Sequence, residues 1–188
     1  NITVINAAPA HSNPFINSTY GNNATNESLN CFNRSTADAD NDLVTNFYRW
    51  FLNGTLLGNS LPYLNHSNFS RNDTIICEIT PGDGLLNGTA ANSSGLKILN
   101  SAPYQNKTLD NFSMSEETLV NITLKETIFD EDNDSLTYFV AGNDSLSVTF
   151  NHSAGNASIL PRSNFYGTDT LYFIAFDGQY NTSTNNIT

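Results

Sequence analysis

The stretch Asp73-Thr-Ile-Ile-Cys-Glu-Ile-Thr80 decides the fold class, because its apolar and polar side chains largely alternate. A period of two is typical of a strand that buries one face. Three more stretches have this strand-like character: Val120-Asn-Ile-Thr-Leu124, Ser145-Leu-Ser-Val-Thr-Phe150 and Thr170-Leu-Tyr-Phe-Ile-Ala-Phe176. Turn-forming Asn-Gly, Gly-Asp-Gly and Asp-Gly segments lie between such runs, which recur at roughly 8–12-residue spacing. The pattern predicts an all-β fold of antiparallel β-sandwiches.

The composition excludes several classes of protein. The 188 residues include 18 acidic and 7 basic side chains, a net charge of −11, so a nucleic-acid-binding face is not expected. The longest apolar run has six residues, 171–176, which is too short for a membrane span. The chain holds 30 Asn, 19 Ser and 20 Thr, which disfavour helices, whereas its 38% hydrophobic content argues against disorder.

Most of the asparagines lie in Asn-x-Ser/Thr sequons. Chance would place Ser or Thr two residues after roughly six of the 30 asparagines, but 20 match the acceptor pattern. The alternative is a polar surface without glycans. The excess favours an extracellular or cell-surface glycoprotein, and the two cysteines agree with an oxidising compartment. The expected attachment sites are Asn1, Asn17, Asn23, Asn26, Asn33, Asn53, Asn65, Asn68, Asn72, Asn87, Asn92, Asn106, Asn111, Asn121, Asn133, Asn143, Asn151, Asn156, Asn181 and Asn186.

One phrase occurs twice and predicts the domain organisation. Val4-Ile-Asn-Ala-Ala-Pro9 matches Ile98-Leu-Asn-Ser-Ala-Pro103, and the two prolines are 103 − 9 = 94 residues apart. This length suits one sandwich domain, and proline suits the start of an edge strand. We therefore expect domains at residues 7–100 and 101–188, with residues 1–6 as a strand that completes a preceding domain or subunit. The second domain is expected to lack its own last strand.

The two ends of the chain share the text Asn-Ile-Thr, at residues 1–3 and 186–188. When residues 1–3 are superimposed on residues 186–188, the sequence at the join forms an uninterrupted strand followed by the repeated phrase. For a match of only three residues, coincidence is the alternative. Because it begins at Asn, the sequence is expected to be a mature form or a piece of a longer chain. Either it is one repeat of a tandem array, or each subunit lends a seam strand, Ile2, Thr3, Val4, Ile5 and Asn6, to the preceding subunit. Both arrangements produce a head-to-tail filament, because such a contact does not close on itself.

The order Cys31, Trp50, Cys77 resembles that of immunoglobulin domains, in which a disulfide between two sheets packs on the tryptophan. The resemblance implies a Cys31–Cys77 bridge, with two free buried thiols as the alternative. Such a bridge closes a span of 77 − 31 = 46 residues and is expected to stabilise the domain by about 4 kcal/mol. Ile75 stands where that family has a tyrosine two residues before its second cysteine, which departs from the pattern.

Other motifs resemble tandem repeats of bacterial and archaeal surface proteins. Residues 48–54 and Thr80-Pro-Gly-Asp-Gly84 resemble sandwich repeats of the polycystic-kidney-disease type. Three motifs of the second domain, at 129–138, 160–168 and 173–178, resemble cadherin-like repeats. These resemblances imply an extracellular protein with two tandem immunoglobulin-like β-sandwich domains, serving adhesion or surface architecture.

Each domain contains an Asp-x-Asp-x-Asp run, formed by Asp38, Asp40 and Asp42 and by Asp130, Asp132 and Asp134. Alternating carboxylates on an extended loop can converge on Ca²⁺, which takes six to eight oxygen ligands. Neither run has the glycine and glutamate that complete a helix-loop-helix calcium loop. A solvated acidic turn is therefore the competing interpretation.

No motif predicts catalysis, because the sequence contains neither a Gly-x-Ser-x-Gly elbow nor a glycine-rich phosphate loop. None of His11, His66 and His152 has metal-ligand spacing to another histidine. The sequence predicts a non-enzymatic structural subunit of an extracellular glycosylated filament that needs no cofactor. Its expected partner is another copy of the chain. The alternatives are an adhesin or surface-layer module that recognises cells or polysaccharide, and a non-catalytic appendage of a secreted enzyme.

Overall fold

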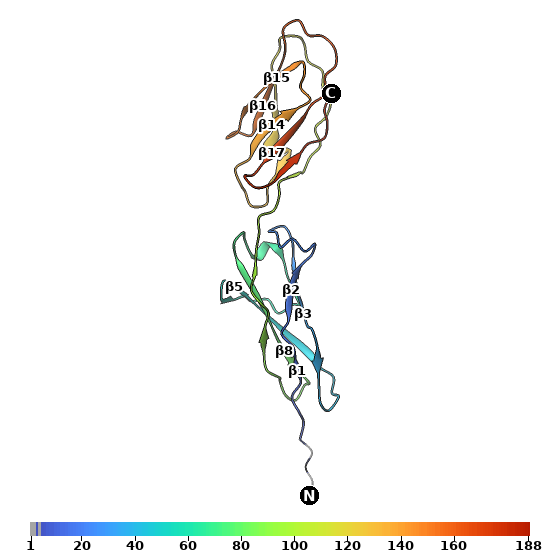
Figure 1. The fold of residues 1–188 in the computed structure, drawn as a ribbon, viewed down its shortest axis with the longest axis vertical. Helices are drawn as coiled ribbons and strands as arrows, with labels where there is room; N and C mark the ends of the chain where they lie inside the picture. Colours follow the sequence, from blue (N-terminus) through green and yellow to red (C-terminus); the bar gives the residue numbers. More distant parts are fainter. Residues whose placement is uncertain (1–2, 4) are drawn as a thin grey trace. The chain divides into compact units, whose positions relative to one another are not determined.

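The computed structural model describes Thr3 and residues 5–188 and divides the chain into two compact units, Asn1–Asn100 and Ser101–Thr188. Each unit is built from strands and their connecting loops (Figure 1). Within the described residues the only helical segments are two short 3-10 turns, η1 (His66–Asn68) and η2 (Leu124–Glu126). Neither of these turns, nor any other helical segment among the described residues, could span a membrane. The prediction of an all-β fold is confirmed.

The first unit contains two main sheets whose strand pairs are antiparallel. One sheet has the order β2-β3-β7, and the other has the order β10-β8-β5-β6 with β9 also paired to β8. A further pair joins β1 to β4. The strands are β1 (Ala10–His11), β2 (Phe15–Ser18), β3 (Leu29–Phe32), β4 (Thr36–Ala37), β5 (Thr45–Leu52), β6 (Thr55–Leu56), β7 (Tyr63–Leu64), β8 (Thr74–Gly82), β9 (Ala91–Asn92) and β10 (Leu96–Lys97).

The core of the first unit follows from the alternation along β8. Ile75, Cys77 and Ile79 are completely buried, and the residues between them are only partly covered, as the period of two predicts. Trp50 on β5 is also fully buried and pairs in register with Cys77. Its indole Nε1–H donates to the Leu61 carbonyl at 2.9 Å, so the buried polar atom is satisfied.

The second unit has the same kind of layering. One sheet has the order β12-β16-β15, the other has the order β14-β17-β18, and β11 pairs with β13. Its core contains Leu124, Tyr138, Ile159, Phe173 and Ile187 among its buried residues. The strands are β11 (Tyr104–Gln105), β12 (Val120–Thr123), β13 (Ile128–Phe129), β14 (Thr137–Ala141), β15 (Leu146–Asn151), β16 (Asn156–Pro161), β17 (Tyr172–Phe176) and β18 (Asn181–Ser183).

The expectation that the second unit lacks its own last strand is wrong. Strand β18 pairs with β17, and the chain continues alongside it until Ile187 forms an antiparallel bridge with Leu171. The segment 184–188 has a weak strand pattern, because Ile187 is its one apolar residue. Thr184 is nevertheless buried, and its hydroxyl accepts the N–H of Phe173 at 3.0 Å. The last strand is present as far as Ile187.

Candidate functional site

A pocket of about 720 Å³ opens on the second unit beside the end of this last strand. Two loops form most of its wall, residues 112–116 and 165–169, and Thr188 lies at its edge. The backbone of Thr188 is already engaged on the first loop, because its carbonyl accepts the Phe112 N–H at 3.2 Å. The pocket therefore lies beside the backbone of Thr188.

Hydrogen bonds show which residues of the two units are equivalent. In the first unit the Ser93 N–H donates to the Cys77 carbonyl at 2.8 Å, and the Ser93 hydroxyl accepts the Cys77 N–H at 3.1 Å. In the second unit Thr184 and Phe173 repeat both bonds, at 2.8 and 3.0 Å. The penultimate strands are therefore equivalent at an offset of 173 − 77 = 96 residues, and the last strands at 184 − 93 = 91.

A second pair in each unit supports the same offsets. Leu96 pairs with Ile75 in the first unit, and Ile187 pairs with Leu171 in the second. The differences are again 187 − 96 = 91 and 171 − 75 = 96. The two last strands thus run in the same register against their neighbours.

The first unit continues its last strand with Ile98, which is completely buried. The Ile98 N–H donates to the Asp73 carbonyl at 2.8 Å, and its carbonyl accepts the Asn72 N–H at 2.9 Å. The equivalent position in the second unit is 98 + 91 = 189, which follows Thr188 directly. The equivalents of Asn72 and Asp73 are Thr168 and Asp169, and both line the pocket. The pocket therefore lies at the position of the second unit that is equivalent to Ile98.

Equivalent phenylalanines in the two units differ in burial at this position. Phe69 is only 8% exposed and belongs to the core cluster that contains Ile98. Its equivalent at 69 + 96 is Phe165, which is half-buried and lines the pocket. Phe165 was not among the site residues predicted from sequence, although a repeat points to it: Asn68-Phe-Ser-Arg-Asn-Asp-Thr74 aligns with Asn164-Phe-Tyr-Gly-Thr-Asp-Thr170.

Part of the expected seam strand lies outside the described residues, namely Ile2 and Val4. Thr3 and Ile5 are described and are not assigned to a strand, and Ile5 is 80% exposed. The Asn6 side chain donates from Nδ2 to Asp83 Oδ2 at 2.9 Å. Hydrogen bonds from the Leu86 backbone, the Asn6 side chain and the Leu85 backbone hold the pKa of Asp83 below its ordinary value.

The sequon asparagines are more exposed than the other asparagines. Asn1 lies outside the described residues; of the remaining 19, fifteen are exposed, four are half-buried and none is buried. Among the ten asparagines outside sequons, four are exposed, five are half-buried and Asn100 is buried. Asparagines that are followed two positions later by Ser or Thr are therefore exposed more often than the other asparagines. The half-buried sequon residues are Asn23, Asn33, Asn143 and Asn156.

A disulfide joins Cys31 on β3 to Cys77 on β8 in the structure, and these strands belong to the two main sheets of the first unit. Both cysteines are buried. The bridge spans 46 residues and lies in the core that includes Trp50. It therefore couples the two sheets covalently through the centre of the sandwich.

The three aspartates of each Asp-x-Asp-x-Asp run lie close together within their own unit. Within each run, one carboxylate oxygen per residue lies within 4.8 Å of the others. The first aspartate of both runs is deeper than the rest of its run, and Asp130 is only 6% exposed. Burial raises the pKa of Asp130 above its ordinary value, and repulsion from Asp134 and Asp132 adds to this shift. Hydrogen bonds from the backbones of the same two residues oppose it.

The three histidines contact different neighbours in the fold. His152 stacks on Tyr138 and Phe150, and its Nδ1 accepts the Tyr138 N–H at 3.0 Å. His11 Nε2 is 3.2 Å from the Thr89 carbonyl, and His66 lies in η1. These contacts place the rings in separate parts of the chain, and none of them joins two histidines.

Comparison with known proteins finds a family that is similar to the second unit. A family described as "Bacterial Ig domain" matches residues 100–188. Among solved structures, the chain is similar to an endo-fucoidan hydrolase, MfFcnA4 from glycoside hydrolase family 107, with 16% identity and a TM-score of 0.36. The match covers 96% of this chain and 28% of the hydrolase, so the chain spans little more than a quarter of that protein. No curated protein matches the chain.

Two further similar structures come from one receptor. The N-terminal Ig1-2 module of the Drosophila receptor protein tyrosine phosphatase DLAR has 10% identity and a TM-score of 0.33, covering 96% of this chain and 97% of the module. Tandem Ig repeats of Dlar have 10% identity and a TM-score of 0.27, covering 95% of both chains. The prediction of two tandem immunoglobulin-like β-sandwiches is confirmed, and residues 100–188 are similar to the Bacterial Ig domain family.

Proposed function

We propose that the chain is a non-catalytic structural subunit of an extracellular filament, built head to tail by strand complementation. The observation that carries the proposal is the pocket at the position equivalent to the buried Ile98. The repeated phrase aligns Pro103 with Pro9, so the sequence counterpart of Ile98 is residue 98 − 94 = 4, which is Val4. The structural equivalent, 98 + 91 = 189, and Val4 differ by 185 residues, as do the two Asn-Ile-Thr segments (188 − 3 = 185), and this agreement supports the proposal.

In this arrangement residues 2–6 of one copy continue the last strand of another copy. Val4 enters the pocket beside Phe165, as Ile98 packs in one core with Phe69 in the first unit. Burying such an aliphatic side chain stabilises a contact by about 1.5–3 kcal/mol. Backbone hydrogen bonds to the strand edge fix the register. Tandem repetition in a longer chain would place the same residues in the same pocket through a covalent link.

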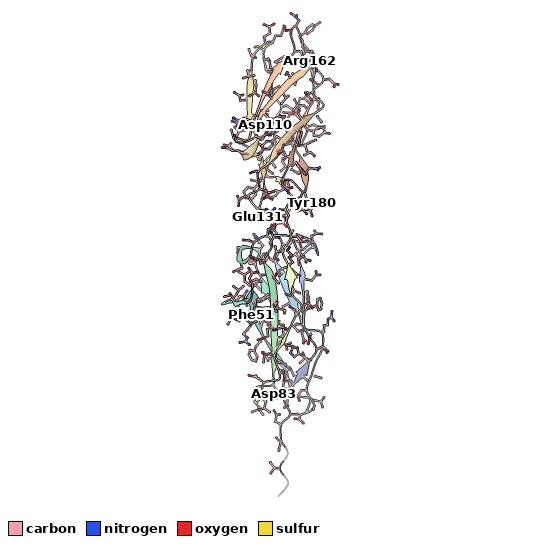
Figure 2. All side chains as sticks on the ribbon, turned by 60° about the vertical axis from the view of Figure 1, so that its left-hand side comes forward. Phe51, Asp83, Asp110, Glu131, Arg162 and Tyr180 are labelled. Carbon is pink, nitrogen blue, oxygen red and sulfur yellow. A yellow bond between two sulfur atoms is a disulfide. The ribbon has the colours of Figure 1, made fainter. Side chains whose placement is uncertain are left out.

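The two ends of the second unit favour assembly in a line. Arg162 follows Pro161, which lines the pocket, and Figure 2 places Arg162 at one end of this unit. Figure 2 places Glu131, which lies between Asp130 and Asp132, toward the opposite end. Asp132 accepts the N–H of Ser101, so the unit begins at that end. The unit begins at one end and would receive the strand at the other, an arrangement that suits head-to-tail assembly.

The N-glycan coat is the second part of the proposal, and the exposure of the sequon asparagines supports it. Neutral sugars keep a surface hydrated where charged side chains are few, and they cover strand edges that would otherwise pair with other chains. We expect glycopeptide mass spectrometry of the native material to find hexose-containing adducts at most of the fifteen exposed sequons. Unmodified peptides throughout would contradict the coat and leave the strand proposal intact.

Deletion of residues 1–6 tests the assembly. We expect the shortened chain to remain monomeric by light scattering and negative-stain microscopy, because the pocket then has no strand to receive. The matched control is Thr3→Ser, which keeps the seam strand and the Asn1 sequon and should keep the filaments. Filaments that persist after the deletion would contradict strand donation. Particles that bind polysaccharide without forming filaments would favour the adhesin alternative, for which Tyr166, 87% exposed at the pocket, is the candidate contact.

A further inference from the structure

The acidic loop at residues 130–134 combines three features that neither the filament nor the glycan coat requires. Asp130 Oδ1 accepts two backbone N–H groups, from Asp132 at 2.9 Å and from Asp134 at 3.2 Å. These bonds fix the Asp130 carboxylate and fold the loop around it. One oxygen from each of the three aspartates then lies within 4.8 Å of the others. Three like charges held so close repel one another unless a cation lies between them.

The second oxygen of Asp130 is the observation that points to a ligand. Asp130 is 94% buried, and its Oδ2 is inaccessible and has no hydrogen-bond partner among the described residues. A buried carboxylate oxygen without a hydrogen-bond donor raises the free energy of the folded state, because it has lost its hydration and forms no hydrogen bond in exchange. The first unit repeats the feature at Asp38, whose Oδ1 accepts the Asp40 and Asp42 N–H groups while its Oδ2 is buried without a partner.

The middle aspartate of each run connects the loop to the start of its unit. Asp132 Oδ2 accepts both the N–H of Ser101 at 2.8 Å and the Ser101 hydroxyl at 3.1 Å. In the first unit Asp40 Oδ2 accepts the Ala7 N–H at 2.7 Å. Ala7 and Ser101 occupy the same place in the repeated phrase, two residues before proline. Both loops therefore hold the first residues of their units by the same contact.

We propose that Asp130, Asp132 and Asp134 bind one Ca²⁺ ion, which fixes Asp132 and through it the Ser101 backbone. Calcium–oxygen distances of about 2.3–2.6 Å place ligands on opposite sides of the ion about 4.6–5.2 Å apart, which accommodates the observed spacing. Mg²⁺ needs a tighter octahedron, at about 2.0–2.1 Å, and gives up its waters reluctantly. Carboxylate oxygens with water in the remaining positions match the preference of Ca²⁺.

The test is a calcium titration of the chelator-treated full chain, carried out with Asp38→Asn to silence the first-unit run. Isothermal titration calorimetry should give one Ca²⁺ per chain, with a dissociation constant of about 10⁻⁴–10⁻³ M, as in other extracellular modules. The Ser101, Asp132 and Asp134 amide resonances should shift during the titration, and the melting temperature should rise with Ca²⁺ concentration.

Asp130→Asn added to this background is the decisive variant, because the asparagine Oδ1 can still accept the two N–H groups while one charge is lost. We expect it to weaken calcium binding at least about tenfold and to remain folded without the ion. Asp110→Asn makes the same charge change at an exposed residue outside the loop and should bind as before. Absence of calcium heat up to about 10 mM, equal binding of Mg²⁺, or unchanged affinity in Asp130→Asn would overturn the proposal.

Discussion

Replacing Phe165 with aspartate is expected to leave monomers where the unchanged chain forms filaments. Phe165 is half-buried at the wall of the pocket, and its counterpart Phe69 belongs to the same buried cluster as Ile98. A carboxylate at this place removes the apolar contact of the incoming Val4. It also has to lose its water when the strand docks, which costs several kcal/mol for an unpaired charge. This cost in free energy exceeds the stabilisation that one docked aliphatic side chain contributes.

The control for this variant is Phe139→Asp, which introduces the same charge at an aromatic residue that is 50% exposed on β14 and does not line the pocket. Circular dichroism and thermal melting should show that both variants remain folded. Sedimentation velocity should then find monomers for Phe165→Asp and filaments for Phe139→Asp. Filaments of normal length from folded Phe165→Asp would mean that the pocket receives no strand.

Replacing both Cys31 and Cys77 with alanine is expected to lower the free energy of unfolding of the first unit by about 4 kcal/mol. The bridge closes a 46-residue span between the two sheets, so its loss releases the unfolded chain from a long loop constraint. Such a change is a large share of the stability of a small domain. The second unit, which has no cysteine, should keep its stability.

Guanidinium unfolding followed by tryptophan fluorescence measures this effect, because the one tryptophan, Trp50, lies in the core of the first unit. The chain without residues 1–6 is the suitable background, since filament dissociation would otherwise overlap with unfolding. Untreated and reductant-treated chains of natural sequence provide the comparison. A loss below about 1 kcal/mol would show that the disulfide adds little to the sheet packing.

Strand β8 could be predicted from sequence because its core-facing residues, Ile75, Cys77 and Ile79, are apolar and alternate strictly. The last strand of the second unit is only weakly indicated by sequence, because Thr184 reaches the core through a hydroxyl that accepts the Phe173 N–H. A polar residue that is buried and satisfied looks the same in sequence as one in a loop. The physical signal in that segment is limited to Ile187.

The register proposed for the seam rests on sequence, whereas the pocket could not be predicted from sequence. The repeated phrase alone aligns Val4 with Ile98. The pocket wall comes from loops about fifty residues apart, 112–116 and 165–169, and only the sandwich brings them together. The proximity of the three aspartates follows from their alternation, but the burial of Asp130 and the bond from Ser101 to Asp132 depend on tertiary structure.

Cross-linking between copies is the most direct test of the central claim that residues 2–6 of one copy fill the pocket of another. Val4→Cys and Met114→Cys place one thiol on the donated strand and one on the pocket wall. After mild oxidation of filaments, denaturing gels without reductant should show a ladder of covalent multimers that collapses to monomers when reductant is added. Each single substitution should give no ladder. Monomers alone from intact filaments, or high-mass bands that survive reduction, would contradict strand donation between separate copies.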